Sequence, residues 1–547
     1  MVKRKLPLAL VVLLLATCKE SPTNPRTTNP QSVSVLTQHN DNTRAGWNDN
    51  ETALTTSNVN VQQFGKVFTL TVDDQVYAQP LVVGDLAIGS ERRNVVYVAT
   101  VNNTVYAFDG DDGTQYWKRN FTAPGMRPPR NTDMTGACGG NYTNFSGNMG
   151  IVGTPVIDTV TGTIYFVARS TTGGAAFVQD LHAVNIVSGS EVAGSPVRIT
   201  ANYAGNGDGS VNNVITFDAQ KQNQRQGLTL VNDMVYVTFS SHCDWGPYHG
   251  WILGYNAATL QRQVVYNVTP NGYAGGMWES GMGMAADAQG SLYIVTGNGT
   301  VGDSSDPTRL TNRGNSALKL TLSGATLQVS SYFTPFDYQA QNDADLDYGT
   351  MGSLLIPNST YFLTGGKDGS LYFLNKDNMG GWVSSSNQVQ QVVPLGSSSN
   401  MHCQAAYYKG STKEFIYVWS ENDVLRGIPF DRGSNQLDRT GEIDFLGAGG
   451  PTGQSGAVLS VSSNASTDGT GILWASYPMS GDAESFVTPG ILRAFDANDV
   501  TRELWNNHQN PSRDDAGSYA KFSPPTIANG HVYLPTFSNK VVVYGLR

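Results

Sequence analysis

Short runs of apolar and polar residues alternate along the chain, and one pattern recurs over most of its length. In this pattern a Tyr or Trp stands inside a short β-branched run, and successive instances are 56 to 71 residues apart. The instances are VVYVAT at Tyr97, TIYFVA at Tyr165, MVYVTF at Tyr236, SLYIVT at Tyr293, TYFLTG at Tyr361, FIYVWS at Tyr417, ILWASY at Trp474 and HVYLPT at Tyr533. Such runs of β-branched and aromatic residues predict strands.

Each instance belongs to a unit that offers four strands. A further strand follows that ends in a turn, as in residues 104–117, and an apolar run precedes it, as in residues 152–158. Eight units with four strands each are typical of propeller blades packed around one axis. No helical periodicity is sustained anywhere in the chain. The sequence therefore predicts an all-β fold, an eight-bladed β-propeller with four-stranded blades.

The two ends of the repeat array predict how the ring closes. The last unit ends after its third strand at residues 540–547, whereas residues 64–72 form a strand before the first unit. We expect this N-terminal strand to become the outer strand of the last blade. Length alone would suggest three or four domains, but the repeat predicts one propeller over residues 36–547.

The N-terminus carries an export signal. Lys3, Arg4 and Lys5 precede an apolar run that ends at Thr17, which is too short to cross a bilayer of about 30 Å. We expect a signal peptide over residues 1–17, a Pro/Thr/Asn-rich linker over 18–35, and lipidation of Cys18 in a lipobox-like segment. The predicted location is the periplasm or the outer membrane or cell surface, with membrane contact only through the lipid. Plain secretion with an unmodified Cys18 is the alternative.

Composition and charge narrow the functions. Charged residues make up 14% of the chain and hydrophobic residues 39%, which excludes a disordered protein. Loss of residues 1–17 would change the net charge from −10 to −13, which argues against a nucleic-acid partner. We expect a monomer that binds a small molecule or an envelope protein. Among Cys138, Cys243 and Cys403 we expect one disulfide, but the sequence does not choose the pair.

Blade-end motifs carry a resemblance to a known family. Ala107-Phe108-Asp109 is followed by Gly113 and Trp117, residues 492–505 repeat this motif, and a weaker copy occurs at residues 181–189. These motifs resemble the pyrroloquinoline quinone (PQQ) repeats of the quinoprotein alcohol dehydrogenase-like propellers. The resemblance implies that Trp117 and Trp505 pack between blades and that PQQ is a candidate cofactor. The chain departs from the family in having no adjacent cysteine pair and no haem-binding CxxCH motif. Non-catalytic lipoproteins use the same propeller.

The longest inter-strand segments predict that one face of the propeller is rich in loops, where function usually lies. The richest loop contains His242, Cys243, Asp244 and His249, which are residue types that bind zinc, copper or iron. His402, from across the mouth, is a candidate to complete such a metal site, and Asp244 is a candidate catalytic residue. His508 is a weaker candidate metal ligand. The alternative is a tight loop held by hydrogen bonds.

Other candidates lie elsewhere on this face. Trp278 could support a planar cofactor and Glu279 could act as a general base, although Trp278 could equally pack between blades. Lys367 could contact an anionic cofactor, although its Asp-Gly neighbours first indicate a hairpin turn. The alternating carboxylates Asp343, Asp345 and Asp347 suggest Ca²⁺, with a surface loop as the alternative.

The sequence thus supports two hypotheses. The first is an exported PQQ-like propeller that binds a ligand, a quinone cofactor or a metal at its loop-rich face and acts as an oxidoreductase on small hydroxylated substrates. The alternative is a non-catalytic envelope lipoprotein that serves as a protein-binding or assembly scaffold.

Overall fold

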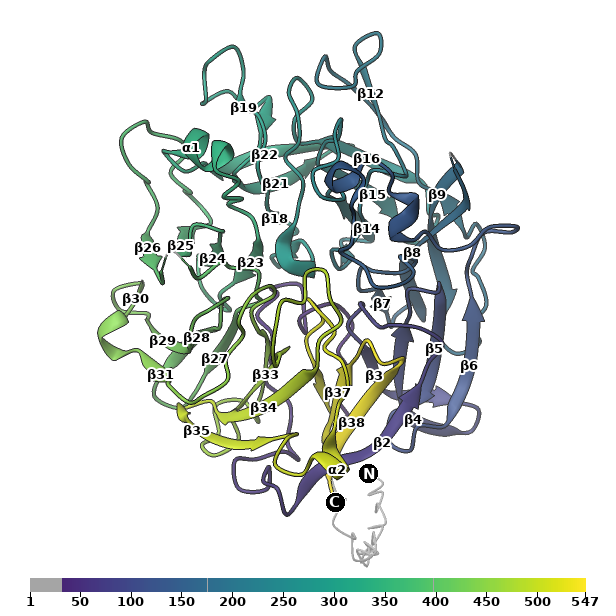
Figure 1. Ribbon diagram of the computed structural model, residues 1–547, viewed down its shortest axis with the longest axis vertical. Helices are drawn as coiled ribbons and strands as arrows, with labels where there is room; N and C mark the ends of the chain where they lie inside the picture. The colour runs from purple at the N-terminus through teal and green to yellow at the C-terminus, as the bar shows by residue number, and fades with distance from the viewer. Residues whose placement is uncertain (1–31, 175, 397) are drawn as a thin grey trace, which may run out of the picture.

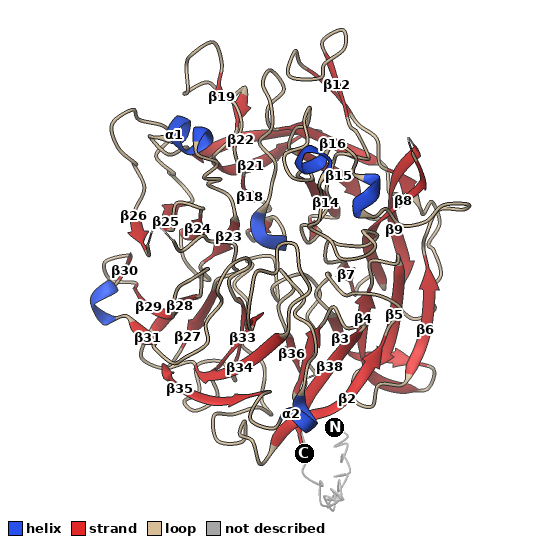
Figure 2. Ribbon diagram, in the orientation of Figure 1, coloured by secondary structure: helices blue, strands red, loops and turns tan. Residues whose placement is uncertain are grey.

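Eight sheets, each with at least four strands, follow one another around a ring in the computed structural model (Figure 1). Their strands pair antiparallel, except that Trp47–Asn48 pairs parallel with Val461 and Ser462. The structure describes residues 32–547 except 175 and 397. The predicted signal peptide, Cys18 and most of the predicted linker lie outside these residues. Strands dominate the ring and the helices are short (Figure 2).

The first four blades are built as follows. Blade one contains β3 (Leu81–Ile88), β4 (Glu91–Ala99), β5 (Thr104–Asp109) and β6 (Gln115–Asn120). Blade two contains β7 (Val156–Asp158), β8 (Thr163–Gly173), β9 (Ala176–Asn185) and β10 (Val197–Arg198). Blade three contains β13 (Thr229–Val231), β14 (Met234–Phe239), β15 (Trp251–Asn256) and β16 (Arg262–Asn267). Blade four contains β17 (Ala285–Ala286), β18 (Leu292–Val295), β21 (Ala317–Ser323) and β22 (Thr326–Phe333).

The remaining blades continue the ring. Blade five contains β23 (Met351–Leu355), β24 (Tyr361–Gly365), β25 (Ser370–Asn375) and β26 (Gln391–Pro394). Blade six contains β27 (Ala406–Lys409), β28 (Glu414–Val418), β29 (Leu425–Asp431), β30 (Gln436–Leu437) and β31 (Ile443–Phe445). Blade seven contains β1 (Trp47–Asn48), β32 (Val458–Ser462), β33 (Ile472–Pro478), β34 (Gly490–Asp496) and β35 (Asp499–Asn506). Blade eight contains β36 (Thr526–Ala528), β37 (His531–Pro535), β38 (Lys540–Leu546) and β2 (Phe64–Thr71).

A few short elements lie between or beside the blades. Two small hairpins pair β11 (Asn202–Ala204) with β12 (Val214–Thr216) and β19 (Val301–Gly302) with β20 (Asn312–Arg313). The α-helices are α1 (Tyr338–Asp343) and α2 (Pro511–Asp514), and the 3₁₀ turns are Asn131–Asp133, Ala137–Gly140, Glu279–Gly281 and Arg439–Gly441. Among the described residues, no helix has the length and apolar character needed to span a membrane.

The recurrent aromatic pattern marks the second strand of every blade, from β4 through β37. The prediction of an eight-bladed all-β propeller is therefore confirmed. β2 pairs antiparallel with β38, with Phe64 opposite Leu546, and the two strands lie side by side at the bottom of Figure 1. The N-terminal strand thus closes the ring as the outer strand of blade eight, as predicted.

The aromatic residues at the blade ends dock against the next blade. Trp117 is buried, and its indole nitrogen donates a hydrogen bond of 3.0 Å to the carbonyl of Ile186 in blade two. Gly189 packs so closely that a Cβ there would lie 2.7 Å from the Trp117 ring, and its φ of +68° also favours glycine. Trp505 is fully buried against Phe64 of blade eight, with ring centres 5.0 Å apart. The expectation that Trp117 and Trp505 pack between blades is confirmed.

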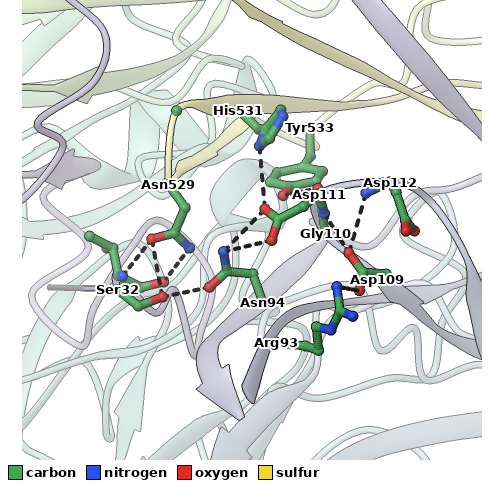
Figure 3. A network of polar contacts seen from close by, with 12 residues as sticks. Ser32, Arg93, Asn94, Asp109, Gly110, Asp111, Asp112, Asn529, His531 and Tyr533 are labelled. Carbon is green, nitrogen blue, oxygen red and sulfur yellow. Dashed lines mark hydrogen bonds and ion pairs between the residues drawn. The ribbon is translucent and has the colours of Figure 1, made fainter. Parts of the chain in front are cut away.

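The junction between blades eight and one also carries a polar network (Figure 3). The Tyr533 hydroxyl donates to the carbonyl of Gly110 over 2.9 Å. The side chain of Asn529 accepts a hydrogen bond of 2.6 Å from the backbone nitrogen of Val33. The chain therefore already contacts the propeller at residue 33, inside the segment predicted to be a linker.

Residues 35–48, which we call the axial segment, contact every blade in chain order. Their partners are Val82, Ile157, Leu228, Ala286, Leu355, Tyr407, Val461 and Ile527, each in or beside the innermost strand of blades one to eight. Arg44 of this segment is fully buried. Its guanidinium donates to the carbonyl of Gln38 over 2.7 Å and to the Thr229 hydroxyl over 2.7 Å. One segment, in which residues 37–43 form bends and turns, therefore ties all eight blades together on the inside of the ring.

Candidate functional site

A cavity with two connected compartments lies among the loops that join the blades. The residues that line this cavity come from loops all around the ring, and in sequence they range from Tyr77 to Phe522. The inner compartment is lined by Tyr142, Arg225, Trp278, Lys521, Phe522 and neighbours. The outer compartment is lined by Asp244, Asp345, Asp347, Lys367, His402, Glu421, Asp482 and Glu484. Arg225, Cys243 and Trp278 line both compartments.

A disulfide between Cys138 and Cys243 ties two of these loops together. The two residues are 105 positions apart in sequence and their Cα atoms are 5.4 Å apart. Cys403 is a free cysteine and is fully buried, which raises the pKa of its thiol. The predicted single disulfide is present, and the structure identifies the pair. Cys243 has no free thiolate, which corrects its assignment as a metal ligand.

The predicted histidine ligands do not share a site. His242 is fully buried behind the cavity wall, where its Nδ1 lies 2.8 Å from the Tyr142 hydroxyl. Burial, together with the positive charges of Arg169 and Arg225, holds the pKa of His242 well below its usual value. His242 is therefore neutral and does not line either compartment.

His249 and His508 are also away from the cavity. His249 is buried, with its ring nitrogens 3.0 Å from the Thr269 hydroxyl and 2.9 Å from the carbonyl of Asp208. This is the arrangement of a loop held by hydrogen bonds. His508 is exposed on the surface. Within residues 32–547, no three His, Cys, Asp or Glu side chains are grouped so that they could hold a metal ion.

Trp278 lines both compartments, with the Arg225 guanidinium over its ring. The guanidinium carbon lies 5.4 Å from the centre of the Trp278 ring and 4.9 Å from that of Phe522. Arg225 also donates a hydrogen bond of 3.0 Å from Nε to the carbonyl of Trp278. The buried indole nitrogen of Trp278 has no hydrogen-bond partner among the described residues.

Glu279 lies in a different environment from its sequence neighbour Trp278, which lines the cavity. Glu279 is fully buried and does not line either compartment, and its Oε1 accepts a hydrogen bond of 3.0 Å from the backbone nitrogen of Val295. Burial raises the pKa of Glu279 to about 8. A carboxyl group that stays protonated at neutral pH cannot accept a proton, so this placement argues against the general-base role that we predicted for Glu279.

Lys367 follows β24 and holds two of the alternating carboxylates. Its Nζ lies 2.7 Å from Asp347 and 3.1 Å from Asp345. Burial opposes the charge on Lys367, but these two carboxylates more than offset burial and raise its pKa. A lysine thus occupies the position between Asp345 and Asp347 where the sequence suggests Ca²⁺. The third carboxylate of the pattern, Asp343, is the last residue of helix α1.

Asp244 lies in the outer compartment close to these carboxylates. Its Oδ1 accepts a hydrogen bond of 2.5 Å from the Tyr248 hydroxyl. Burial raises the pKa of Asp244 to about 6, and the negative charge of Asp347 contributes in the same direction. Asp244 therefore changes charge just below neutral pH.

The inner compartment is cationic, which the sequence did not indicate. Lys521 is 6% exposed, and its Nζ donates a hydrogen bond of 2.6 Å to the carbonyl of Asn144. Burial, followed by repulsion from Arg225, lowers the pKa of Lys521 to about 7. Arg169 is 1% exposed, and none of its three guanidinium nitrogens has a hydrogen-bond partner within the described chain.

Arg169, Arg225 and Lys521 have no salt bridge to any described carboxylate. Burial lowers the pKa of both arginines to about 10, so both remain charged at neutral pH. No recognisable motif surrounds these three residues, and only the folding of distant loops brings Arg225 and Lys521 to the same compartment. Carboxylates, in contrast, predominate in the outer compartment.

Fold and cavity together define an eight-bladed propeller with a polarised chamber among its inter-blade loops. No family model matches the chain, and no curated protein matches it by sequence. Solved structures with the same fold include a quinohemoprotein alcohol dehydrogenase from Pseudomonas putida HK5, with a TM-score of 0.58, 12% identity, and coverage of 94% of this chain and 80% of that one.

Two further structures are similar. A europium-containing methanol dehydrogenase has a TM-score of 0.57 and 12% identity, over 94% of this chain and 98% of that one. A quinohemoprotein alcohol dehydrogenase from Comamonas testosteroni has a TM-score of 0.55 and 12% identity, over 94% and 80%. The resemblance to the PQQ-type propellers is thereby confirmed at the level of the fold.

Proposed function

We propose that the protein is an exported oxidoreductase whose inner compartment binds a planar, polyanionic quinone of the PQQ type and whose outer compartment receives a small hydroxylated substrate. The observation that carries this proposal is the pair of cations Arg225 and Lys521, which line the inner compartment without a salt bridge to any described carboxylate. The buried guanidinium of Arg169, which lies outside the lining, has no hydrogen-bond partner among the described residues. Burying a charge without a counter-charge costs several kcal/mol per ion, so this arrangement favours a ligand that supplies negative charge.

The chemistry of PQQ suits these residues. PQQ is a flat ortho-quinone with three carboxylate groups, and carboxylates form strong charge-assisted hydrogen bonds with guanidinium and ammonium groups. Arg225 and Lys521 would contact the carboxylates, while Trp278 and Phe522 offer aromatic surface and an unpartnered indole N–H. When bound, an ortho-quinone supplies an acceptor for the hydrogen and electron pair removed from a carbinol carbon.

The described residues do not form a metal site that would fit as PQQ does. The described chain offers no group of three or more His, Cys, Asp or Glu side chains at metal-binding spacing, and Lys367 already pairs with Asp345 and Asp347. We therefore derive no step through a metal ion. The scaffold alternative has no specific contact in its favour, and the similar solved structures are dehydrogenases.

Titration of the purified protein with PQQ tests the proposal. We expect quenching of tryptophan fluorescence with saturable, one-to-one binding. Arg225→Gln and Lys521→Met should each weaken binding by about tenfold or more, since a hydrogen bond to a charged group contributes about 1.5–3 kcal/mol. Arg502→Gln, which removes an exposed arginine far from the cavity, is the matched control. Absence of binding, or equal affinity in all variants, would contradict the proposal.

A further inference from the structure

His402 and Glu421 form a hydrogen-bonded pair in the outer compartment. The Nδ1 atom of His402 lies 2.6 Å from Oε1 of Glu421. His402 precedes β27 and Glu421 follows β28, and the backbone nitrogen of Glu421 donates a hydrogen bond of 3.2 Å to the carbonyl of Asn400. Both side chains are largely buried, and both line the compartment. The fold therefore holds the imidazole in one orientation.

This pairing determines which ring nitrogen is free. A carboxylate can only accept a hydrogen bond, so Nδ1 carries the proton and Nε2 keeps its lone pair. Nε2 of His402 has no hydrogen-bond or ion-pair partner among residues 32–547, and this atom is accessible to solvent. His249, by contrast, uses both of its ring nitrogens. His402 is the histidine that lines the cavity, and its free nitrogen is a proton acceptor.

Charged side chains from several loops surround this ring. The other titratable groups that line the same compartment are Asp244, Asp345, Asp347, Asp482, Glu484, Lys367 and Arg225. Carboxylates are in the majority, and Lys367 is neutralised by Asp345 and Asp347.

We infer that His402 is the proton acceptor for the substrate hydroxyl and that Glu421 positions it; this inference rests on the function proposed above. The hydroxyl O–H bond breaks, and its proton forms an N–H bond at Nε2 of His402. With an ortho-quinone bound, the carbinol hydrogen would pass with its electron pair to that acceptor, so that the substrate would be oxidised to a carbonyl compound and the quinone reduced. Glu421 keeps its charge throughout and balances the imidazolium.

Variants at both positions test this inference. General-base catalysis typically contributes about 10²–10⁴-fold, so His402→Ala should lower kcat by about that factor. Affinity for PQQ, measured by fluorescence, should change by less than about threefold, since His402 lies outside the inner compartment. Added imidazole should restore part of the activity of His402→Ala but not that of Glu421→Gln. The matched control is His508→Ala, which removes an exposed histidine outside the cavity.

A second readout does not depend on turnover. Diethyl pyrocarbonate modifies an accessible, unprotonated imidazole nitrogen, and the absorbance change counts modified histidines. We expect one fewer modified histidine in His402→Ala than in the wild type, and slower modification of His402 in Glu421→Gln. If His402 is not modified, or if His402→Ala keeps its kcat, the inference is overturned while the proposed function stands. If the wild type neither binds PQQ nor oxidises alcohols, the proposed function itself fails.

Discussion

Two fully buried arginines differ in their hydrogen bonding, one on the inside of the ring and the other behind the lining of the cavity, near Tyr142. Arg44 of the axial segment donates hydrogen bonds from all three guanidinium nitrogens to the axial segment and to blades three and four. Arg169 of β8 is equally buried, yet its guanidinium has no partner among the described residues. Burial lowers the pKa of both to about 10. Arg44 and Arg169 therefore differ in their hydrogen-bond partners and not in how deeply they are buried.

This difference separates structure from function in the propeller. In the axial segment, the buried side chains of Arg44 and His39 have hydrogen-bond partners for all of their nitrogens, as is usual for buried polar groups. Oδ1 of Asn42 is the exception among its described side chains. Beside the cavity, the guanidinium of Arg169, the indole nitrogen of Trp278 and Nε2 of His242 are buried and have no hydrogen-bond partner among the described residues, and of these three only Trp278 lines the cavity. Unsatisfied buried polar groups cost stability, and proteins retain them mainly at functional sites. The buried guanidinium near the cavity thus differs from that of Arg44 in having no protein partner, which is the arrangement that the proposed anionic ligand requires.

The largest effect is expected from Arg44→Met. The change removes the donors that hold the axial segment to the blades and leaves several buried carbonyls unpaired. Loss of a buried, fully bonded charge typically costs about 3–5 kcal/mol. We expect the free energy of unfolding in urea to fall by that amount. An unchanged unfolding midpoint would show that the axial segment does not stabilise the ring.

Removal of the Cys138–Cys243 disulfide should have the next largest effect. The disulfide closes a long loop, with 105 residues between its ends, and loss of such a bond typically costs about 2–5 kcal/mol. We expect the double variant Cys138→Ser/Cys243→Ser to lose stability by this amount and to bind PQQ more weakly. Reduction of the wild type with dithiothreitol should reproduce the effect, and the double variant should not respond to it. Equal midpoints would contradict the prediction.

The fold was predictable because its signals are local and repeated. The aromatic in each second strand, the lone strand at residues 64–72 and the blade-end Trp117 and Trp505 each follow from neighbours in sequence. A strand pattern needs only alternation along a few residues. Eight imperfect copies then reinforce one another, so the architecture could be derived without any structure.

The site was predictable only in part. The long loops indicated the correct face, and Asp244, Trp278, Lys367 and His402 do line the cavity. Their partners could not be found in the same way, because each comes from a distant loop whose conformation depends on tertiary contacts. The other half of the Cys243 disulfide is an example, since Cys138 is 105 residues away and no local pattern links the two.

The contrast between the two arginines predicts opposite results for the same substitution. Arg169→Met should leave the ligand-free protein as stable as the wild type or make it more stable by about 1–4 kcal/mol, since replacing an unpaired buried charge with an apolar side chain relieves its desolvation cost. It should also weaken PQQ binding about threefold to tenfold through the lost positive charge. Thermal unfolding with and without PQQ measures both. If Arg169→Met destabilises as much as Arg44→Met, Arg169 is a structural residue.

The smallest effect concerns the pH dependence of ligand binding. Burial and Arg225 place the pKa of Lys521 at about 7, so Lys521 loses its positive charge as the pH rises through neutrality. Affinity for an anionic ligand should therefore be highest below pH 7 and fall about threefold to tenfold between pH 6 and 8. Asp244, with a pKa of about 6, acts in the same direction, because it gains a negative charge as the pH rises.

Two substitutions separate these contributions. Lys521→Met should remove the part of the decrease centred near pH 7, and Asp244→Asn should remove the part near pH 6. Lys409→Met, on an exposed lysine of blade six, should leave the profile unchanged. Fluorescence titrations with PQQ from pH 5 to 9 measure the effect. An affinity that rises with pH would mean that the ligand is not anionic, and the cations of the inner compartment would then need another explanation.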